Sequence, residues 1–372
     1  MVLCVQDTTE LDFSSKKQIA GLGPLSYAAQ HGMYLHPTLA LTPEGLCLGV
    51  LDAWMWARDP ETHGQDDKRA LPIEAKESVR WLEGFARVAE LAERLPGTPL
   101  VYVADRECDI HEFMVRAQAQ PAAWLIRAVQ PRRTDKGAGI GEHLAQVLGQ
   151  VAFVLPRAKG RPSRPVTQTL RAERVVLQPR RGKPVEVTAR LACEETPPPG
   201  AMPVGWRLLT NLLVETLEQA AEKIDRYRRR WVAEVFFRIL KSSCEVEALQ
   251  LSALERLEPA LALYLIIAWR VLYLTTLGQR CPELPCEVVF DEAEWRAVYI
   301  VSKRQPPPPE PPALNEMLRL VAGFGGYLGR KGDGPPGPKA VWTGLQRARD
   351  FVLGVQAMAS LQREMVVCNG LH

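Results

Sequence analysis

The chain has 372 residues, more than one domain usually holds, so we expect two or three packed units. Its content of 47% hydrophobic and 24% charged residues is that of an ordinary soluble globular protein. A net charge of +3 permits a nucleic-acid partner but does not by itself indicate one.

Local sequence features argue against three further classes of protein: those held by zinc or disulfides, secreted proteins and membrane proteins. The cysteines are scattered, and only Cys281 and Cys286 lie close together, which argues against a zinc site or a disulfide framework and for free thiols in a reducing cytoplasm. The first ten residues lack the basic and apolar regions of a secretory signal. Arg270 interrupts the apolar run 260–269 well short of the roughly 20 residues of a membrane span, so we expect a buried core helix and no membrane partner.

The first predicted elements are strands. The apolar run Val2–Gln6 ends at Asp7, followed by Thr8 and Thr9, as a buried strand ends at a site. Two more strand-like runs, 34–41 and 46–53, flank the turn-forming segment Thr42-Pro43-Glu44-Gly45 and predict a hairpin.

Helices and strands then alternate. A helix is expected from Pro72 to Leu95, closed by Pro96-Gly97, and the apolar strand 100–104 again ends at an aspartate, Asp105. A helix over 110–118 and a strand over 123–128 follow. Three strands, helix, strand, helix and strand, with acids ending the first and fourth strands, is the order of an RNase H-like core.

From about residue 131 to 203 the helical period disappears, and the short runs 150–156, 174–178 and 185–191 alternate with Gly, Pro and basic turns. This pattern predicts a β-rich insertion. Its basic residues fit either contacts with DNA phosphates or solvated turns, namely Arg157, Lys159, Arg161, Arg164, Arg180, Arg181 and Lys183.

The segment 227–241 predicts an amphipathic helix. At about 100° per residue, five of its polar side chains fall within a sector of roughly 80°, namely Tyr227, Arg230, Glu234, Arg238 and Lys241. Val232, Phe236, Ile239 and Leu240 lie on the opposite side. A lone carboxylate among cations fits a metal ligand beside a phosphate track, but a solvated face with ion pairs fits as well.

These residues resemble the bacterial insertion-sequence DDE transposases of the insertion-sequence-four (IS-four) family. Tyr227, Arg230, Glu234 and Lys241 reproduce its Y-x2-R-x3-E-x6-K (YREK) signature. The stretch 103–111 around Asp105 resembles its second-aspartate motif, and Gln6-Asp7-Thr8-Thr9 its first. Further similarity lies at 76–82, 206–210 and 325–333, so the resemblance covers nearly the whole chain.

The resemblance implies a site and its partners. Asp7, Asp105 and Glu234 would hold two Mg²⁺ ions, with Mn²⁺ as a substitute, for metal-dependent DNA cleavage and strand transfer in cut-and-paste transposition. DNA contacts are expected from Tyr227, Arg230, Arg238, Lys241, Trp206 and Arg127. Trp206 occupies a base-stacking position, although a core tryptophan before the strand 208–210 remains the alternative. The expected partners are double-stranded DNA with terminal inverted repeats, target DNA and a second copy of the chain, in a bacterial cytoplasm.

The expected fold is α/β: an RNase H-like core of a mixed sheet flanked by helices, a β-rich insertion and a helical C-terminal region. We place its parts at 1–130 (core, first part), 131–205 (insertion), 206–280 (core, second part) and 281–372 (dimerisation). Family members carry a DNA-binding region before the first catalytic strand, and Asp7 lies so near Met1 that we expect this region to be absent. A truncated, non-transposing remnant or dimerising regulator, and a stand-alone RNase H-like nuclease, are the alternatives.

Overall fold

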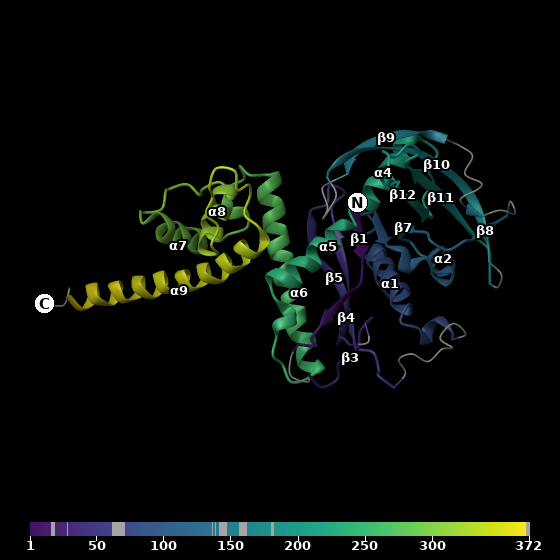
Figure 1. Cartoon of the computed structure of the whole chain (residues 1–372). Coiled ribbons are helices and arrows are strands. Elements are labelled where there is room, and N and C mark those ends of the chain that lie inside the picture. Colours follow the sequence, from purple (N-terminus) through teal and green to yellow (C-terminus); the bar gives the residue numbers. More distant parts are fainter. Residues whose placement is uncertain are drawn as a thin grey trace. The chain divides into compact units, whose positions relative to one another are not determined.

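The computed structural model describes residues 1–15, 19–27, 29–61, 71–135, 137, 139–140, 147–155, 162–179 and 182–369. The chain forms two compact units (Figure 1). The first comprises residues 1–10 and 23–234, and the second residues 11–22 and 235–372. The fold is mixed α/β with a helical C-terminal region, as the sequence predicts.

A mixed sheet forms the first unit. Its core strands lie in the order β5-β4-β1-β6-β7, with bounds β1 Val2–Gln6, β4 His31–Leu41, β5 Cys47–Trp56, β6 Leu100–Ala104 and β7 Ala123–Arg127. β1 pairs antiparallel with β4 and parallel with β6, and β6 pairs parallel with β7. β4 and β5 form the predicted hairpin. The short strands β2 (Thr9–Asp12) and β3 (Gly23–Pro24) also pair with β4.

Two helices cover one face of this sheet. Helix α1 (Val79–Arg94) contributes Trp81 and Phe85 to the core, and α2 (His111–Ala117) contributes Phe113 and Met114. These side chains pack with strand residues such as Tyr102, and apolar burial of this kind is the main stabilising term in folding. The short helix η2 (Arg106–Cys108) joins β6 to α2.

The predicted insertion extends the same sheet. Its strands are β8 (Arg133–Thr134), β9 (Val147–Leu155), β10 (Arg164–Gln178) and β11 (Val185–Cys193), and β12 (Gly205–Thr210) joins β11 to β7. Helix α4 (Leu217–Arg228) covers the other face of β11: Arg190 donates to the Ala220 carbonyl, whereas the adjacent Ala189 belongs to the core beneath α1 and α2. The insertion and the core therefore form one continuous sheet.

Two helix predictions need correction. The helix expected from Pro72 is interrupted: a short turn, η1 (Ile73–Ala75), precedes α1, which begins at Val79 with Ser78 as its N-cap residue. The single helix expected over 227–241 is divided into the end of α4, a turn at residues 229–230, α5 (Trp231–Arg238) and a π-helical turn, η3 (Ile239–Ser243). The polar residues of 227–241 therefore do not follow one ideal helical stripe.

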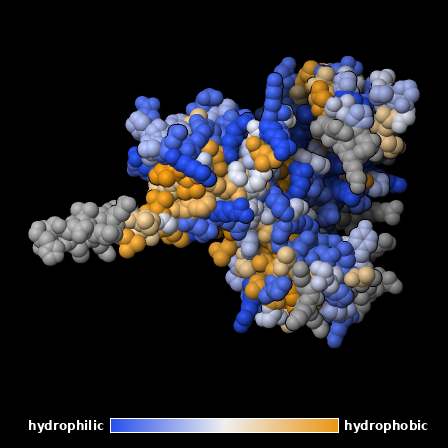
Figure 2. All heavy atoms as spheres, turned by 60° about the vertical axis from the view of Figure 1, so that its left-hand side comes forward, coloured by the Kyte–Doolittle hydropathy of each residue, from blue (hydrophilic) through white to orange (hydrophobic). Residues whose placement is uncertain are grey.

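The second unit is helical. After η3 and η4 (Val246–Ala248) come α6 (Leu254–Arg280), η5 (Cys286–Val288), α7 (Glu292–Lys303), α8 (Leu314–Phe324) and α9 (Pro338–Asn369). By length and composition alone α6 could cross a membrane. A methyl group on Gly278 of α6 would lie 2.2 Å from Leu318 of α8, so these two helices are in close contact. Apolar side chains also gather on the surface of this helical unit (Figure 2).

Candidate functional site at the carboxyl ends of the core strands

Asp7 and Asp105 follow two neighbouring parallel strands. The register of β1 and β6 pairs Gln6 with Ala104, so the aspartates are the next residues at the same edge of the sheet. The Asp7 Oδ1 atom accepts a hydrogen bond from the Thr8 amide at 2.9 Å, and an Asp105 carboxylate oxygen accepts one from the Glu107 amide at 2.8 Å. The two carboxylates are therefore held at adjacent strand ends.

The Gln6 side chain holds the end of β1 in place. This wholly buried side chain donates to the Thr38 hydroxyl at 3.0 Å and accepts from the Tyr102 hydroxyl. Gly84 on α1 makes room for it, because a methyl group there would lie 1.9 Å from the Gln6 Nε2 atom. Gln6, the residue before Asp7, is thus held by hydrogen bonds with β4 and β6 and by the close approach of α1.

Arg230 connects Asp7 with Glu234. Its Nη1 atom donates to the Asp7 Oδ2 atom and lies 3.6 Å from the Glu234 Oε1 atom. The side chain of Glu234 is 46% exposed, whereas that of Asp7 is 11% exposed. The structure therefore brings the first and third predicted acids to the same guanidinium.

The pKa of the Asp7 carboxyl depends on its burial, on Arg230 and on the other two acids. Burial raises the pKa of its carboxyl from 3.8 to about 7; the positive charge of Arg230 opposes this rise, and the negative charges of Asp105 and Glu234 add to it. Burial lowers the pKa of Arg230, but Asp7, Tyr227, Asp105 and Glu234 together more than offset that effect, and the pKa lies above its usual value. Asp105 and Glu234 are thus close enough to influence the ionisation of Asp7 and of Arg230.

The donor chemistry of this cluster fits a hard divalent cation, because three carboxylates supply oxygen ligands and strong negative potential. Within the described part of the chain, however, no group of three or more His, Cys, Asp or Glu side chains is already arranged around a metal position. Arg230 instead neutralises Asp7. A cation that used the Asp7 Oδ2 atom would therefore have to displace this arginine.

Tyr227, Trp206 and Arg127 lie near the same end of the sheet. Tyr227 is buried; burial raises the pKa of its hydroxyl, while the positive charges of Arg230 and Arg127 oppose the rise. The Trp206 ring lies 6.3 Å from the Tyr227 ring and stacks on Phe153 of β9 at 6.0 Å. Trp206 is thus packed on an insertion strand, and its side chain is only partly buried.

The other predicted basic residues belong to the second unit and to the insertion. Arg238 and Lys241 belong to the second unit, where Arg238 is exposed and the Lys241 ammonium lies 3.8 Å from the Glu247 Oε1 atom. Five of the basic insertion residues lie outside the described residues, namely Arg157, Lys159, Arg161, Arg180 and Arg181. Arg164 forms an ion pair with Glu194.

Acids that lie close to the predicted site residues in the sequence have partners of their own, and one exposed aromatic residue was not predicted from the sequence. The Asp109 Oδ1 atom accepts a hydrogen bond from Arg132 at 2.9 Å, and Glu245 pairs with Lys339 at 2.7 Å.

Trp231, the first residue of α5, is 65% exposed and lies three positions before Glu234 in the sequence. A tryptophan within a charged segment was the available signal, because tryptophan is highly buried on average and its ring offers a large apolar contact area.

Two family models match most of this chain. Residues 82–270, just over half of the chain, match the family described as transposase DDE domain, and residues 266–364 match the transposase Tn5 dimerisation domain. The chain therefore belongs to the DDE-domain transposase family. A solved piggyBac transposase synaptic complex with hairpin DNA is also similar, with 8% identity and a TM-score of 0.37. The alignment covers 75% of this chain and 48% of that one.

Proposed function

We propose that this transposase cleaves DNA and joins strands in a metal-dependent reaction, with Asp7, Asp105 and Glu234 as metal ligands. The observation that carries the proposal is the placement of Arg230 between Asp7 and Glu234 while Asp105 follows the adjacent strand. Carboxylates that lie this close to one another repel unless cations offset their charge.

The chemistry requires an activated water or DNA 3′-hydroxyl and a stabilised leaving oxygen. Two Mg²⁺ ions, or Mn²⁺ in their place, would supply both functions when bound. Asp7, Asp105 and Glu234 would hold these ions. Asp7 is the most buried of the three, and the negative charges of the other two add to the rise of its pKa.

The basic and aromatic residues would position the DNA. Arg230 already lies at the carboxylates, so its guanidinium can bind a phosphate of the reacting strand once a cation neutralises Asp7. Tyr227 and Arg127 contribute a hydroxyl and a cation to the same region. The spacing of Tyr227, Arg230, Glu234 and Lys241 supports membership of the bacterial IS-four group and a phosphate role for Lys241 and Arg238.

A second copy of the chain is the expected protein partner. The match of residues 266–364 to a dimerisation domain supports this, and the exposed apolar side chains of the second unit fit a contact surface, namely Leu263, Ile266, Leu353 and Met358. We propose that the dimer holds paired inverted-repeat ends and captures target DNA, in a bacterial cytoplasm at the nucleoid. The long sheet extension β9 to β11 favours this over a stand-alone RNase H-like nuclease.

The test is metal-dependent cleavage by the purified full chain. Supercoiled plasmid and paired inverted-repeat duplexes should be nicked in Mg²⁺ or Mn²⁺ but not in EDTA. Asp105→Asn and Glu234→Gln should each reduce the rate by at least about a hundredfold, on the scale of removing one important charged catalytic group. Glu107→Gln is the matched control, because this acid is adjacent to the site but is not assigned as a ligand. Equal activity in all three variants would refute the assignment.

A further inference from the structure

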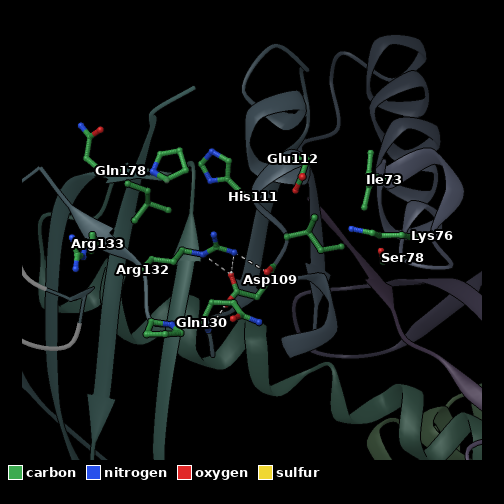
Figure 3. Close-up of a pocket in the computed structure, with 14 residues that line it drawn as sticks. Ile73, Lys76, Ser78, Asp109, His111, Glu112, Gln130, Arg132, Arg133 and Gln178 are labelled. Atoms are coloured by element: carbon green, nitrogen blue, oxygen red, sulfur yellow. Dashed lines mark hydrogen bonds and ion pairs between the residues drawn. The ribbon is translucent and has the colours of Figure 1, made fainter. Parts of the chain in front are cut away.

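A polar cavity lies in the first unit, between the segments that lead into α1 and α2 and the start of the insertion. Its volume is about 580 Å³, and its charged lining comes from Lys76, Asp109, Glu112, Arg132 and Arg133. Figure 3 shows Arg132 extended toward Asp109, with His111 and Lys76 on other sides of the same hollow. None of the three acids of the proposed catalytic site lines it.

Arg132 is fixed in this cavity by the buried carboxylate of Asp109. The Asp109 Oδ1 atom accepts from the Arg132 Nε atom at 2.9 Å and from Nη2 at 2.6 Å, and the Asp109 carbonyl accepts from Nη2 at 2.7 Å. The Asp109 Oδ2 atom is used as well, by the amides of Val129 and Gln130 at 2.8 and 2.7 Å. All hydrogen bonds of the guanidinium to described residues use Nε and Nη2, so Nη1 keeps two donors for a ligand.

Cations outnumber carboxylates among the described residues that line the cavity. Lys76, Arg132 and Arg133 stand against two acids, Asp109 and Glu112. The side chain of Asp109 is fully buried and pairs with Arg132, so Glu112 is the more accessible of these two acids. A pre-oriented guanidinium with two further cations is the arrangement that binds phosphate oxygens best, because little side-chain entropy is lost on binding.

We propose that this cavity binds a backbone phosphate of DNA, at a position separate from the phosphate beside Asp7, Asp105 and Glu234. The inference rests on the proposed function for its ligand, since DNA is the polyanion on which the chain would act. The loops that form the cavity start where two core strands end: Asp109 follows the segment that begins at Asp105, and Arg132 follows β7, which ends at Arg127. DNA held at the carboxyl edge of these strands would therefore meet the cavity as a second contact.

The experiment compares full-length variants by the salt dependence of binding to a duplex of random sequence. Lys76→Gln/Arg133→Gln leaves the Arg132–Asp109 pair intact and should reduce the slope of log K against log salt by about 0.9, the contribution of one phosphate contact. The control Arg94→Gln/Arg174→Gln removes the same charge from exposed positions outside the cavity and should change the slope by much less. Glu112→Gln should strengthen binding, because it removes the accessible opposing charge.

The outcomes separate this proposal from the proposed function. An equal change of slope in the cavity and control variants overturns the cavity proposal, whether or not the wild-type chain cleaves DNA. A selective change in the cavity variant supports it even if no metal-dependent cleavage is found, in which case the catalytic proposal fails alone. If the cavity variant loses affinity for inorganic phosphate but not for DNA, the cavity is a free-anion site and the DNA assignment is wrong.

Discussion

Arg230 and Asp7 form an ion pair across 223 positions of sequence, with the arginine donating from Nη1 to the Asp7 Oδ2 atom. Both side chains are mostly buried. The pair therefore joins the end of the first strand to the turn between α4 and α5, and the arginine offsets the negative charge of Asp7. A cation and the arginine would compete for the same carboxylate oxygen.

The first prediction concerns this pair in the absence of metal. Arg230→Gln leaves Asp7 buried without a cationic partner, and we expect the free energy of unfolding at pH 8 to fall by about 3 kcal/mol. Urea denaturation in EDTA measures it. Adding Asp7→Asn to this variant should restore most of the loss, because the unpaired charge is then gone. Strictly additive effects of the two substitutions would contradict the coupling.

The second prediction is a pH dependence of stability. The pKa of Asp7 is about 7 in the folded chain against an ordinary value of 3.8, so the folded state binds more protons between these pH values. Its stability contribution is full below about pH 4 and is lost as pH rises through 7. In EDTA, Asp7→Asn should therefore reduce the loss of stability between pH 5 and pH 8. An identical loss in the variant and the wild-type chain would show that Asp7 ionises without this cost.

The third prediction links metal to the same group. Mg²⁺ or Mn²⁺ binds the ionised carboxylates, so at pH 8 either ion should raise the melting temperature of the wild-type chain, with about 2.7 kcal/mol of stabilisation at a hundred times the dissociation constant. The shift should be smaller at pH 5.5, where protons compete for Asp7. Asp105→Asn should reduce it and Glu107→Gln should not. Equal shifts in these two variants would place the metal elsewhere.

The fourth prediction tests the support beneath Asp7. Gly84→Ala would place a methyl group 1.9 Å from the Gln6 Nε2 atom, and overpacking of this kind costs about 1–3 kcal/mol. We also expect a lower cleavage rate, because Gln6 precedes Asp7 directly. Gly97→Ala is the matched control: no atom lies within 4 Å of its added methyl group. Equal stability of the two variants would mean that Gln6 moves aside at little cost.

Local sequence predicted the strand ends well but not the pairings between distant segments. Asp7 and Asp105 were found because each directly follows a buried apolar run, and the pairing of Gln6 with Ala104 agrees with their expected closeness. The helix break at residues 229–230 carries no comparable signal, since arginine is a good helix former and neither Gly nor Pro marks the turn. The contact of Arg230 with Asp7 is equally invisible to local reasoning, because the tertiary fold creates it.

The insertion shows the same limit. Its strands were predicted from short apolar runs, but their continuity with the core sheet depends on β12 pairing with β7, where Leu209 lies opposite Ile126. Strand partners so far apart in sequence cannot be chosen from the alternation of apolar and polar residues in either strand alone, because many strands share the same pattern. Asp109 is similar: its sequence neighbourhood resembles a catalytic motif, and only the fold shows that it holds Arg132.

The last prediction separates packing from DNA contact at two tryptophans. Trp206 stacks on Phe153, so Trp206→Ala should lower the free energy of unfolding by roughly 1–3 kcal/mol, whatever it does to DNA binding. Trp231 is 65% exposed, and Trp231→Ala should change stability by less than about 0.5 kcal/mol. If a DNA base stacks on the exposed ring, the same variant should lose about 1–3 kcal/mol of binding free energy, whereas Trp231→Phe should keep part of it. Urea denaturation and DNA titration at fixed salt measure the two effects on the same proteins. Unchanged DNA affinity in Trp231→Ala would remove this residue from the DNA surface. A large loss of affinity without loss of stability in Trp206→Ala would instead assign the stacking role to Trp206.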